Sequence, residues 1–354
     1  MVLQLFGRSK VQLIGVDVSS SAVKILQLSG NSDNIKVERY AVEPLSINAV
    51  VDNNIAEVDL VSAAISKAVN KAGIKVKGAA TAVSGSAVIT KIIQMPSELD
   101  EDELEIQLEM DATQYIPYPI DEVSLDFSVL GPVEGNEEVN NVLIASSRSE
   151  NVDVYLEAFE GAGLDLKVVD VEAFAIERCF NLVRSQYEIN DEEVVALFDI
   201  GANTMTMHAM HKRTGIYSRE QSFGGKQLTE EIMQRYGLSY EEAGLAKRQG
   251  GLPESYESEV LQSFKDTLVQ QVSRALQFFF SATEFGNVDR ILLGGGCAAI
   301  SDIDILVEDQ VGVPTEVINP VNNFKVSSRV SNEALEADAP AMMSVVGLAL
   351  RNFD

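Results

Sequence analysis

LIGVDVSSSAVKILQL (residues 13–28) and VALFDIGANTMTMHAM (residues 195–210) align with each other without a gap. In this alignment Asp199 falls on Asp17 and Gly201 falls on Ser19, and apolar strands flank both turns. The offset, 199 − 17 = 182 residues, is about half of the 354-residue chain. A match at this spacing predicts that the protein consists of two duplicated halves.

Each copy reads as a hairpin in which an aspartate leads into a tight turn of small polar residues. Such turns expose consecutive backbone N–H groups, which bind phosphate, and the aspartate would repel that phosphate unless a divalent cation lay between them. Asp and Ser also serve in ordinary hairpin turns, and either copy alone would favour that interpretation. The matched pair instead predicts a magnesium–nucleotide held between the two halves.

RILLGGGCAAISDIDILVEDQVG (residues 290–312) is a third candidate nucleotide loop. It combines a buried strand, three glycines and a helix, so that backbone can approach a ligand closely, although such turns also serve close packing. It lacks the dinucleotide pattern GxGxxG with a downstream acid, and the chain contains no P-loop GxxxxGK[ST].

The charge balance excludes two classes of partner. Lys and Arg number 27 against 54 Asp and Glu, a net charge of −27. Nucleic acid and anionic lipid both gain affinity mainly from basic residues, so we expect neither nucleic-acid binding nor direct membrane insertion. A basic protein segment is a better partner, and a solvated acidic surface is the simpler explanation.

The cysteine content and hydropathy indicate a cytoplasmic protein. Two distant cysteines, Cys179 and Cys297, and two histidines cannot form a structural zinc site or a disulfide framework. No apolar run of about 18 residues is present, so no membrane span is expected.

The pattern along the chain predicts an α/β protein with a small inserted unit. Ser97 opens an acidic helix that ends at the prolines of IPYPI, and a hairpin with a long connection, GPVEGNEE, follows. The polar stretch at 187–193 is the predicted boundary between halves. The predicted strands are 13–18, 23–28, 35–42, 122–130, 139–147 and 165–171, and the other predicted helices are 57–72, 149–162 and 172–185.

The three loops resemble, in this order, those of the actin-like ATPase superfamily, which includes actin, DnaK-type chaperones, sugar kinases and FtsA. SFGGKQLTEEI (222–232) resembles that superfamily's segment reaching the nucleotide from the second large domain, and APAMMSVVGLAL (339–350) resembles its closing helix. The resemblance implies an α/β actin-like fold, with duplicated ribonuclease-H-like domains around a nucleotide cleft and an FtsA-like IC insert.

A narrower likeness is to the PilM family of type IV pilus proteins. The segments that carry it are residues 5–28, QYIPYPIDEV (114–123) and VVDVEAFAIER (168–178). FtsA attaches to membrane through a C-terminal amphipathic helix, which this sequence does not show, and this difference favours the pilus family. The resemblance implies four subdomains. They are IA at 1–76, 149–187 and 334–354, IC at 77–148, IIA at 188–222 and 286–333, and IIB at 223–285.

The superfamily resemblance also implies roles for individual residues around ATP or ADP with Mg²⁺. Asp17 and Asp199 would hold the metal through waters. The phosphates would be cradled by Ser19, Ser20, Ser21, Gly201, Ala202, Asn203 and Thr204, with Lys24 either reaching them or facing solvent. Gly294, Gly295, Gly296 and Ala298 would line the adenosine, Gly225, Lys226 and Thr229 would close the ribose side, and Lys247 would flank the base or be a surface lysine.

The resemblance to PilM implies a peptide partner at the cytoplasmic face of the inner membrane. Proteins of this family bind the N-terminal cytoplasmic segment of PilN in a groove between IA and IC, and so connect indirectly to PilO, PilP and the secretin in pilus biogenesis and twitching motility. Tyr115, Ile116, Pro117 and Tyr118 are the candidate groove residues, and a helix stop with packed aromatics explains them equally well.

Hydrolysis needs a group that orients water. Glu172 is the candidate by position, Asp170 is its rival, and a helix N-terminal acid is the simpler role. Ser19 stands where many relatives have glycine, so we expect a nucleotide binder with weak or absent turnover. The alternatives are an actin-fold small-molecule kinase and an FtsA-like division scaffold.

Overall fold

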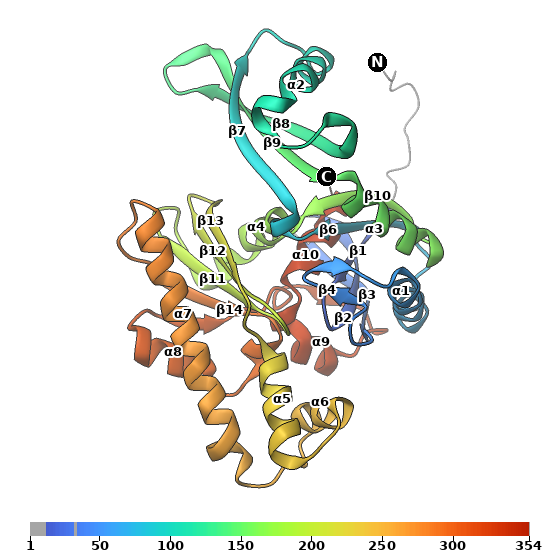
Figure 1. The fold of residues 1–354 in the computed structure, drawn as a ribbon, viewed down its shortest axis with the longest axis vertical. Coiled ribbons are helices and arrows are strands. Elements are labelled where there is room, and N and C mark those ends of the chain that lie inside the picture. The colour runs from blue at the N-terminus through green and yellow to red at the C-terminus, as the bar shows by residue number, and fades with distance from the viewer. Residues whose placement is uncertain (1–11, 32–33, 354) are drawn as a thin grey trace.

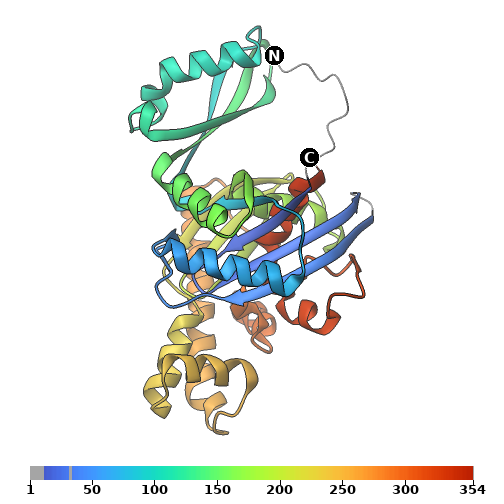
Figure 2. The ribbon, with the colours of Figure 1, turned by 90° about the vertical axis from the view of Figure 1, so that its right-hand side faces the viewer.

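The computed structural model describes residues 12–31 and 34–353, and Figure 1 shows their arrangement. The part of the PilM-like N-terminal segment that precedes residue 12 lies outside these described residues. Two large sheets form the body of the molecule, and a third sheet with its own helix stands apart at one end (Figures 1 and 2).

The two large sheets repeat one topology, which confirms the predicted duplication. The first has the order β10-β6-β1-β2-β3-β16 and the second β13-β12-β11-β14-β15. In both, a meander of three antiparallel strands is followed by two parallel strands on the far side of the first strand. The strands of the first sheet are β1 (Leu13–Val18), β2 (Ala22–Asn31), β3 (Asn34–Pro44), β6 (Gly78–Val83), β10 (Asp165–Val171) and β16 (Lys325–Val326). Those of the second are β11 (Val195–Ile200), β12 (Met205–His211), β13 (Thr214–Gln221), β14 (Arg290–Gly294) and β15 (Thr315–Val317).

Helices cover both sheets because each sheet has two apolar faces to bury. The outer face of the first sheet packs on α1 (Val58–Ala72) and α3 (Ser149–Gly161). A second cluster joins residues of both sheets with α4 (Glu172–Val183) and α10 (Met343–Ala349), so these helices lie between the sheets. A Cβ at Gly347 of α10 would lie 1.8 Å from the carbonyl oxygen of Ala175, and only glycine permits this approach.

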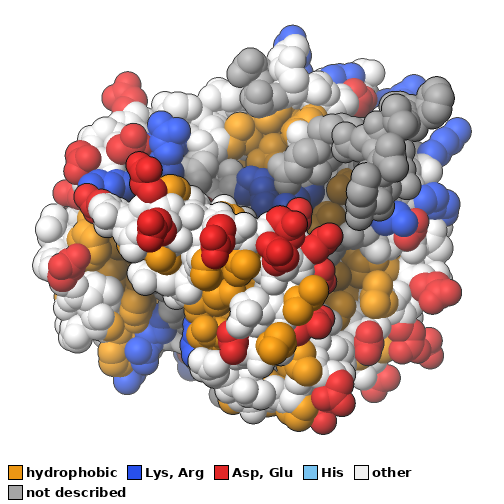
Figure 3. Space-filling view, turned by 90° about the horizontal axis from the view of Figure 1, so that it is seen from above, with side chains coloured by type: hydrophobic (Ala, Val, Ile, Leu, Met, Phe, Trp, Pro, Cys, Tyr) orange, Lys and Arg blue, Asp and Glu red, His pale blue; other side chains and the backbone are white. Residues whose placement is uncertain are grey.

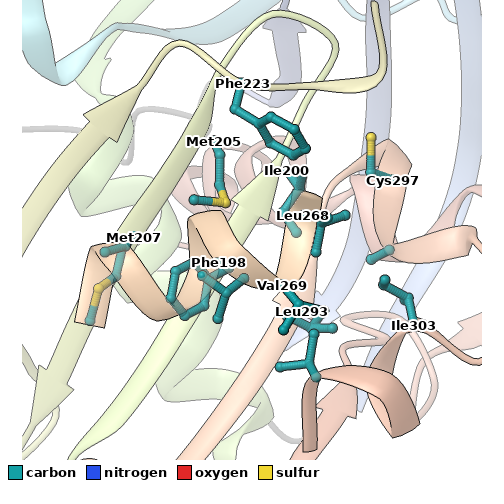
Figure 4. Close-up of a cluster of buried hydrophobic side chains, with 14 of the residues drawn as sticks. Phe198, Ile200, Met205, Met207, Phe223, Leu268, Val269, Leu293, Cys297 and Ile303 are labelled. Carbon is teal, nitrogen blue, oxygen red and sulfur yellow. The ribbon is translucent and has the colours of Figure 1, made fainter. Parts of the chain in front are cut away.

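The outer face of the second sheet is closed by the longest helix, α7 (Gln262–Ala282), and by α8 (Ile303–Val311). Figure 4 shows Phe198 of β11 and Met207 of β12 packed with Leu268 and Val269 of α7. The body also contains the helices α5 (Gly225–Tyr236), α6 (Tyr240–Gln249) and α9 (Asn332–Asp338).

The separate sheet has the order β7-β9-β8, and α2 (Glu101–Tyr115) covers one of its faces. Its strands are β7 (Val88–Pro96), β8 (Val123–Val133) and β9 (Asn136–Arg148). All of α2 and β8 fall within the predicted insert at 77–148. The limits of the four subdomains stay a prediction.

Two local predictions in the insert were wrong. Asp100, not Ser97, caps α2, because Asp100 and Glu103 satisfy each other's backbone N–H groups in a capping box. The segment GPVEGNEE does not form a long loop. The strands β8 and β9 extend into it and are joined by a tight turn at Glu134 and Gly135. Gly131 lies at a bulge of β8, and Pro132 is tolerated because β8 is an edge strand.

Candidate functional site

The two aspartate turns have the same backbone geometry. The Ser19 N–H donates to the Ala22 carbonyl at 3.0 Å, and the Gly201 N–H donates to the Thr204 carbonyl at 2.9 Å. Both bonds recur at the offset found in the sequence, since 201 − 19 = 204 − 22 = 182. Asp17 and Asp199 thus lie one residue before the ends of equivalent central strands, β1 and β11, in the two sheets.

Lys24 points into the site rather than to solvent. It lies opposite Asp17 in the β1–β2 ladder, and its Nζ is 2.6 Å from Asp17 Oδ2. Each of the two side chains is only 15% exposed. The equivalent position in the second half, 24 + 182 = 206, is threonine, so the duplication is asymmetric here.

Carboxylates from both halves surround this lysine. Burial raises the pKa of Glu172 to about 8, and the charges of Asp199 and Asp17 add to that rise. Burial likewise raises the pKa of Asp199, with Asp17 acting in the same direction and Lys24 opposing it. The pKa of Lys24 is raised although its burial lowers it, because the Asp17, Asp199 and Glu172 charges outweigh that effect. The sheets therefore bring Asp17, Lys24, Asp199 and Glu172 into one electrostatic cluster, the cleft cluster.

The donor set of the cleft cluster suits a hydrated magnesium ion. Within residues 12–31 and 34–353, no three His, Cys, Asp or Glu side chains are grouped so that they could hold a metal ion between them. Mg²⁺ usually keeps several waters and takes one or two carboxylates together with substrate phosphates. Asp17 and Asp199 fit that pattern, and a cage made of protein ligands alone does not fit.

The start of α5 is fastened to the second turn. The Gly225 N–H donates to the Gly201 carbonyl at 3.0 Å, and the Lys226 N–H donates to the Ala202 carbonyl at 2.8 Å. The Cys297 thiol contacts the same Gly201 oxygen at 3.5 Å. The predicted phosphate, ribose and adenosine segments of the second half therefore meet at one place.

Gly295 brings the glycine loop against Asp199. Its φ is +84°, and a Cβ there would lie 2.5 Å from Asp199 Oδ1 and 2.4 Å from the Ile200 carbonyl oxygen. Only glycine allows both the left-handed backbone and this approach. Of the other predicted adenosine residues, Gly296 is exposed, whereas Gly294 and Ala298 are buried and Ala298 packs in the core.

Lys247 is not a free surface lysine. Its Nζ donates to the Gly225 carbonyl at 2.8 Å and to Thr229 Oγ1 at 2.7 Å. Thr229 is itself 3% exposed. These two residues therefore brace the first turn of α5 from behind.

Asp170, the rival of Glu172, is committed to an ion-pair network. Its Oδ2 accepts from Arg351 at 2.8 Å and from Arg178 at 3.0 Å. Burial raises the pKa of Asp170, but the hydrogen bond and charge of Arg351 and the charge of Arg178 outweigh burial and hold it below the usual range. This carboxylate joins β10, α4 and the C-terminal turn, so it has a structural role.

The sequence did not predict a contact that bridges the two halves. Asn53, in the turn of the hairpin β4–β5 (Val50–Ile55), donates through Nδ2 to Glu220 Oε2 of β13 at 2.8 Å. The charge of Glu220 also contributes to the raised pKa of Glu172. The DN dipeptide at 52–53 signals a turn, but nothing in the sequence indicates its partner 167 positions away.

A shallow hollow lies between the insert and the body. Its lining residues are Asn54, Ser86, Ala87, Val88, Ile89, Tyr118, Ser146, Ser147, Arg148 and Asn151. Of the four predicted groove residues only Tyr118 lines it, with the Arg148 guanidinium 5.0 Å from its ring centre. Ile116 is 3% exposed, which leaves its side chain little surface to offer a partner.

In the described part of the chain no helix is long and apolar enough to cross a membrane.

Known structures share this architecture. The chain is 29% identical to a protein in the PilM-PilN type IV pilus biogenesis complex, with a TM-score of 0.79 over 98% of this chain and 99% of that one. The ethanolamine utilization protein EutJ from Carboxydothermus hydrogenoformans is 16% identical, with a TM-score of 0.56 over 95% of this chain and 88% of that one. A diol dehydratase-reactivating factor, in its nucleotide-free form, is 9% identical, with a TM-score of 0.52 over 96% of this chain and 99% of that one.

These likenesses, with the duplicated sheets, confirm the actin-like ATPase fold. The family model for the type IV pilus assembly protein PilM matches residues 15–353, nearly the whole chain. The chain therefore belongs to the PilM family of type IV pilus assembly proteins.

Proposed function

We propose that this protein is a nucleotide-holding adaptor of the type IV pilus machinery, which carries ATP or ADP with Mg²⁺ in its cleft and binds the N-terminal cytoplasmic segment of PilN. The observation that carries the first part is the pair of aspartate turns with equivalent backbone hydrogen bonds, whose aspartates share one electrostatic cluster with Lys24 and Glu172. The second part rests on the family and on the similar protein's complex with PilN.

The first turn offers phosphate fewer groups than the sequence predicted. The N–H and hydroxyl of Ser19 both donate to the Ala22 carbonyl, so this residue closes the turn. The side chains of Ser20, Ser21, Asn203 and Thr204 have no hydrogen-bond partner among the described residues. These four side chains are the ones that we propose face the phosphates.

Lys24 supplies the positive charge of the proposed site. It is close enough to Asp17 to bond to it and lies within the field of Asp199 and Glu172, so it can share its charge with a bound phosphate. The magnesium ion, when bound, would neutralise phosphate charge between Asp17 and Asp199.

Glu172 accounts for the proposed weak turnover. In the nucleotide-free protein burial raises the pKa of Glu172 to about 8, so its carboxyl is mostly protonated at pH 7 and is a poor acceptor for a proton from water. The protein would hold ATP longer than an enzyme with an ionised carboxylate in this place.

For the peptide we propose the hollow beside Tyr118 and Arg148. The hollow presents the Tyr118 ring and the Arg148 guanidinium at the junction of insert and body, and the buried Ser146 and Ser147 line it from beneath. An extended peptide can use such groups for backbone hydrogen bonds and apolar contacts. Binding there would place the protein at the inner membrane through PilN, and indirectly in contact with PilO, PilP and the secretin.

Binding of Mg-ATP and of a PilN N-terminal peptide, each measured by calorimetry, tests both parts separately. Asp17→Ala and Asp199→Ala should each weaken Mg-ATP binding by about tenfold or more while leaving a folded protein. Tyr118→Ala and Arg148→Ala should each weaken binding of the PilN peptide and leave binding of Mg-ATP unchanged. Unchanged ATP affinity in both aspartate variants would refute the cleft assignment, and unchanged peptide affinity in both others would refute the hollow.

A small-molecule kinase of the same fold is the alternative from another class. Phosphate transfer measured with sugars and carboxylic acids present separates the two functions. Turnover stimulated about a hundredfold by any such metabolite would overturn the adaptor proposal.

A further inference from the structure

The insert carries an unusual share of the negative charge. Residues 92–147 contain 14 Asp and Glu and no Lys or Arg, so they account for −14 of the chain's net −27. Every salt bridge formed within the described residues uses side chains outside this segment. The insert therefore presents uncompensated negative charge to its surroundings.

Helix α2 adds apolar side chains to this charge. One face packs Leu104, Leu108 and Ala112 on the sheet. On the opposite face Ile106 is 60% exposed and Met110, one turn later, is 73% exposed. We call this the α2 outer face, and its members are Asp102, Glu105, Ile106, Glu109 and Met110.

Figure 3 looks down on the end of the molecule that the insert forms. Acidic and hydrophobic side chains lie next to one another across this face. Ile106 and Met110 are exposed together, one turn apart, and carboxylates flank them. Adjoining exposed apolar side chains rimmed by polar ones are a feature of protein interaction sites.

The chemistry of the face selects one kind of partner. Anionic lipid and nucleic acid would be repelled by the carboxylates. A basic helix with one apolar stripe satisfies both features, because its Lys and Arg side chains can pair with the carboxylates flanking Ile106 and Met110. Methionine side chains adapt readily to such a stripe.

We propose that the α2 outer face docks a basic amphipathic helix of a partner protein. Apolar residues of that helix cover Ile106 and Met110, and its basic residues face Asp102, Glu105 and Glu109. This site is separate from the hollow proposed for PilN, because no residue of α2 lines that hollow.

The test uses a fluorescein-labelled helix of leucine and lysine with an apolar stripe, together with a peptide of the same composition in scrambled order. Anisotropy at physiological salt should show tighter binding of the amphipathic peptide. The double variant Ile106→Ser with Met110→Ser should weaken that binding by about tenfold. Glu105→Gln with Glu109→Gln should weaken it and flatten its salt dependence.

The matched control lies on α8, where Ile305 is 57% exposed one turn before Asp309. Ile305→Ser with Asp309→Asn changes the same kinds of side chain and should leave peptide affinity within about twofold. If the amphipathic and scrambled peptides bound equally, or if the α8 control lost as much peptide affinity as the α2 variants, charge attraction alone would explain the binding. Either result would overturn the proposal. Loss of a wild-type dimer in the Ile106→Ser and Met110→Ser variant, measured by sedimentation, would instead assign the face to a second copy and overturn it too.

Discussion

Lys24 Nζ lies 2.6 Å from Asp17 Oδ2, directly across the β1–β2 ladder, in the half of the molecule that holds the first turn. The duplicated position opposite Asp199 is Thr206. One lysine therefore serves both aspartates, since the charge of Asp199 also raises its pKa. Within the cleft cluster Lys24 is the one cation, and it offsets only part of the charge of Asp17, Asp199 and Glu172.

Lys24→Met should destabilise the nucleotide-free protein by about 3 kcal/mol, because it leaves partly buried carboxylates without their counter-charge. Urea unfolding at pH 7 measures this change, and millimolar Mg²⁺ should restore part of the loss by replacing the missing cation. Lys36→Met is the control, since Lys36 pairs with Glu38 at 2.8 Å but is 39% exposed. Equal stability losses in the two variants would contradict a special role for Lys24.

Glu172→Gln should stabilise the nucleotide-free protein at alkaline pH. The folded-state pKa of about 8 exceeds the ordinary value of 4.5, so the folded protein holds this proton more tightly than the unfolded chain. Wild-type stability should therefore fall between pH 4.5 and about 8, and the variant should lose that part of the slope. Unfolding free energies from pH 5 to 9 measure it, with exposed Glu157→Gln as the control. Parallel pH profiles for wild type and Glu172→Gln would exclude a buried, protonated Glu172.

Asp170→Asn should cost about 3 to 5 kcal/mol of stability, because it leaves Arg178 and Arg351 without their shared buried partner. Asp165→Asn removes an exposed partner of Lys167 and should cost no more than about 1 kcal/mol.

The same network predicts acid sensitivity. Because the folded pKa of Asp170 lies below the ordinary 3.8, its contribution is complete above that value and is lost as pH falls through the folded pKa. Acid unfolding followed by circular dichroism should show a shallower transition in Asp170→Asn than in wild type, and identical transitions would count against the network.

Asn53→Asp should open the contact between the two halves. Asn53 has φ 60°, a conformation that Asp also tolerates, so the change keeps the turn but sets a carboxylate against Glu220. Hydrogen exchange of the backbone amides of residues 50–55 should become faster, and Mg-ATP should dissociate faster. Asn53→Gly keeps the turn without adding charge, and its effect should be smaller. If Asn53→Asp showed the wild-type rate of hydrogen exchange at residues 50–55, the contact would not keep the two halves together.

The sequence predicted the core of the fold because duplication and hydrophobic alternation both appear directly as patterns along the chain. The offset of 182 located both turns, and most strand and helix limits follow from apolar spacing. It failed at the cap of α2, where the capping box of Asp100 and Glu103 prevails over Ser97. It also failed at the β8–β9 hairpin, where strand pairing continues through Gly131 and Pro132 despite their usual turn signal.

The sequence predicted which residue types gather at the candidate site, but not which of them are already hydrogen-bonded to other parts of the protein. Ser19, Thr229 and Lys247 were predicted to contact the nucleotide. Their polar groups instead form hydrogen bonds with the protein's own backbone and side chains in this structure. Glu220 and Asn53 were missed because their contact joins a turn in one half to a strand in the other. Hydrogen-bond partners far apart in sequence leave no pattern along the chain.

The sequence by itself determined the two-fold repeat, the aspartate turns and the acidic insert, because each depends on residue types at fixed spacing. Only the tertiary structure decided that Lys24 turns toward Asp17, that Glu172 holds its proton near neutral pH, and that Asp170 is a structural anchor. Those outcomes depend on burial and on charges brought together by folding, and neither quantity is written in the order of the residues.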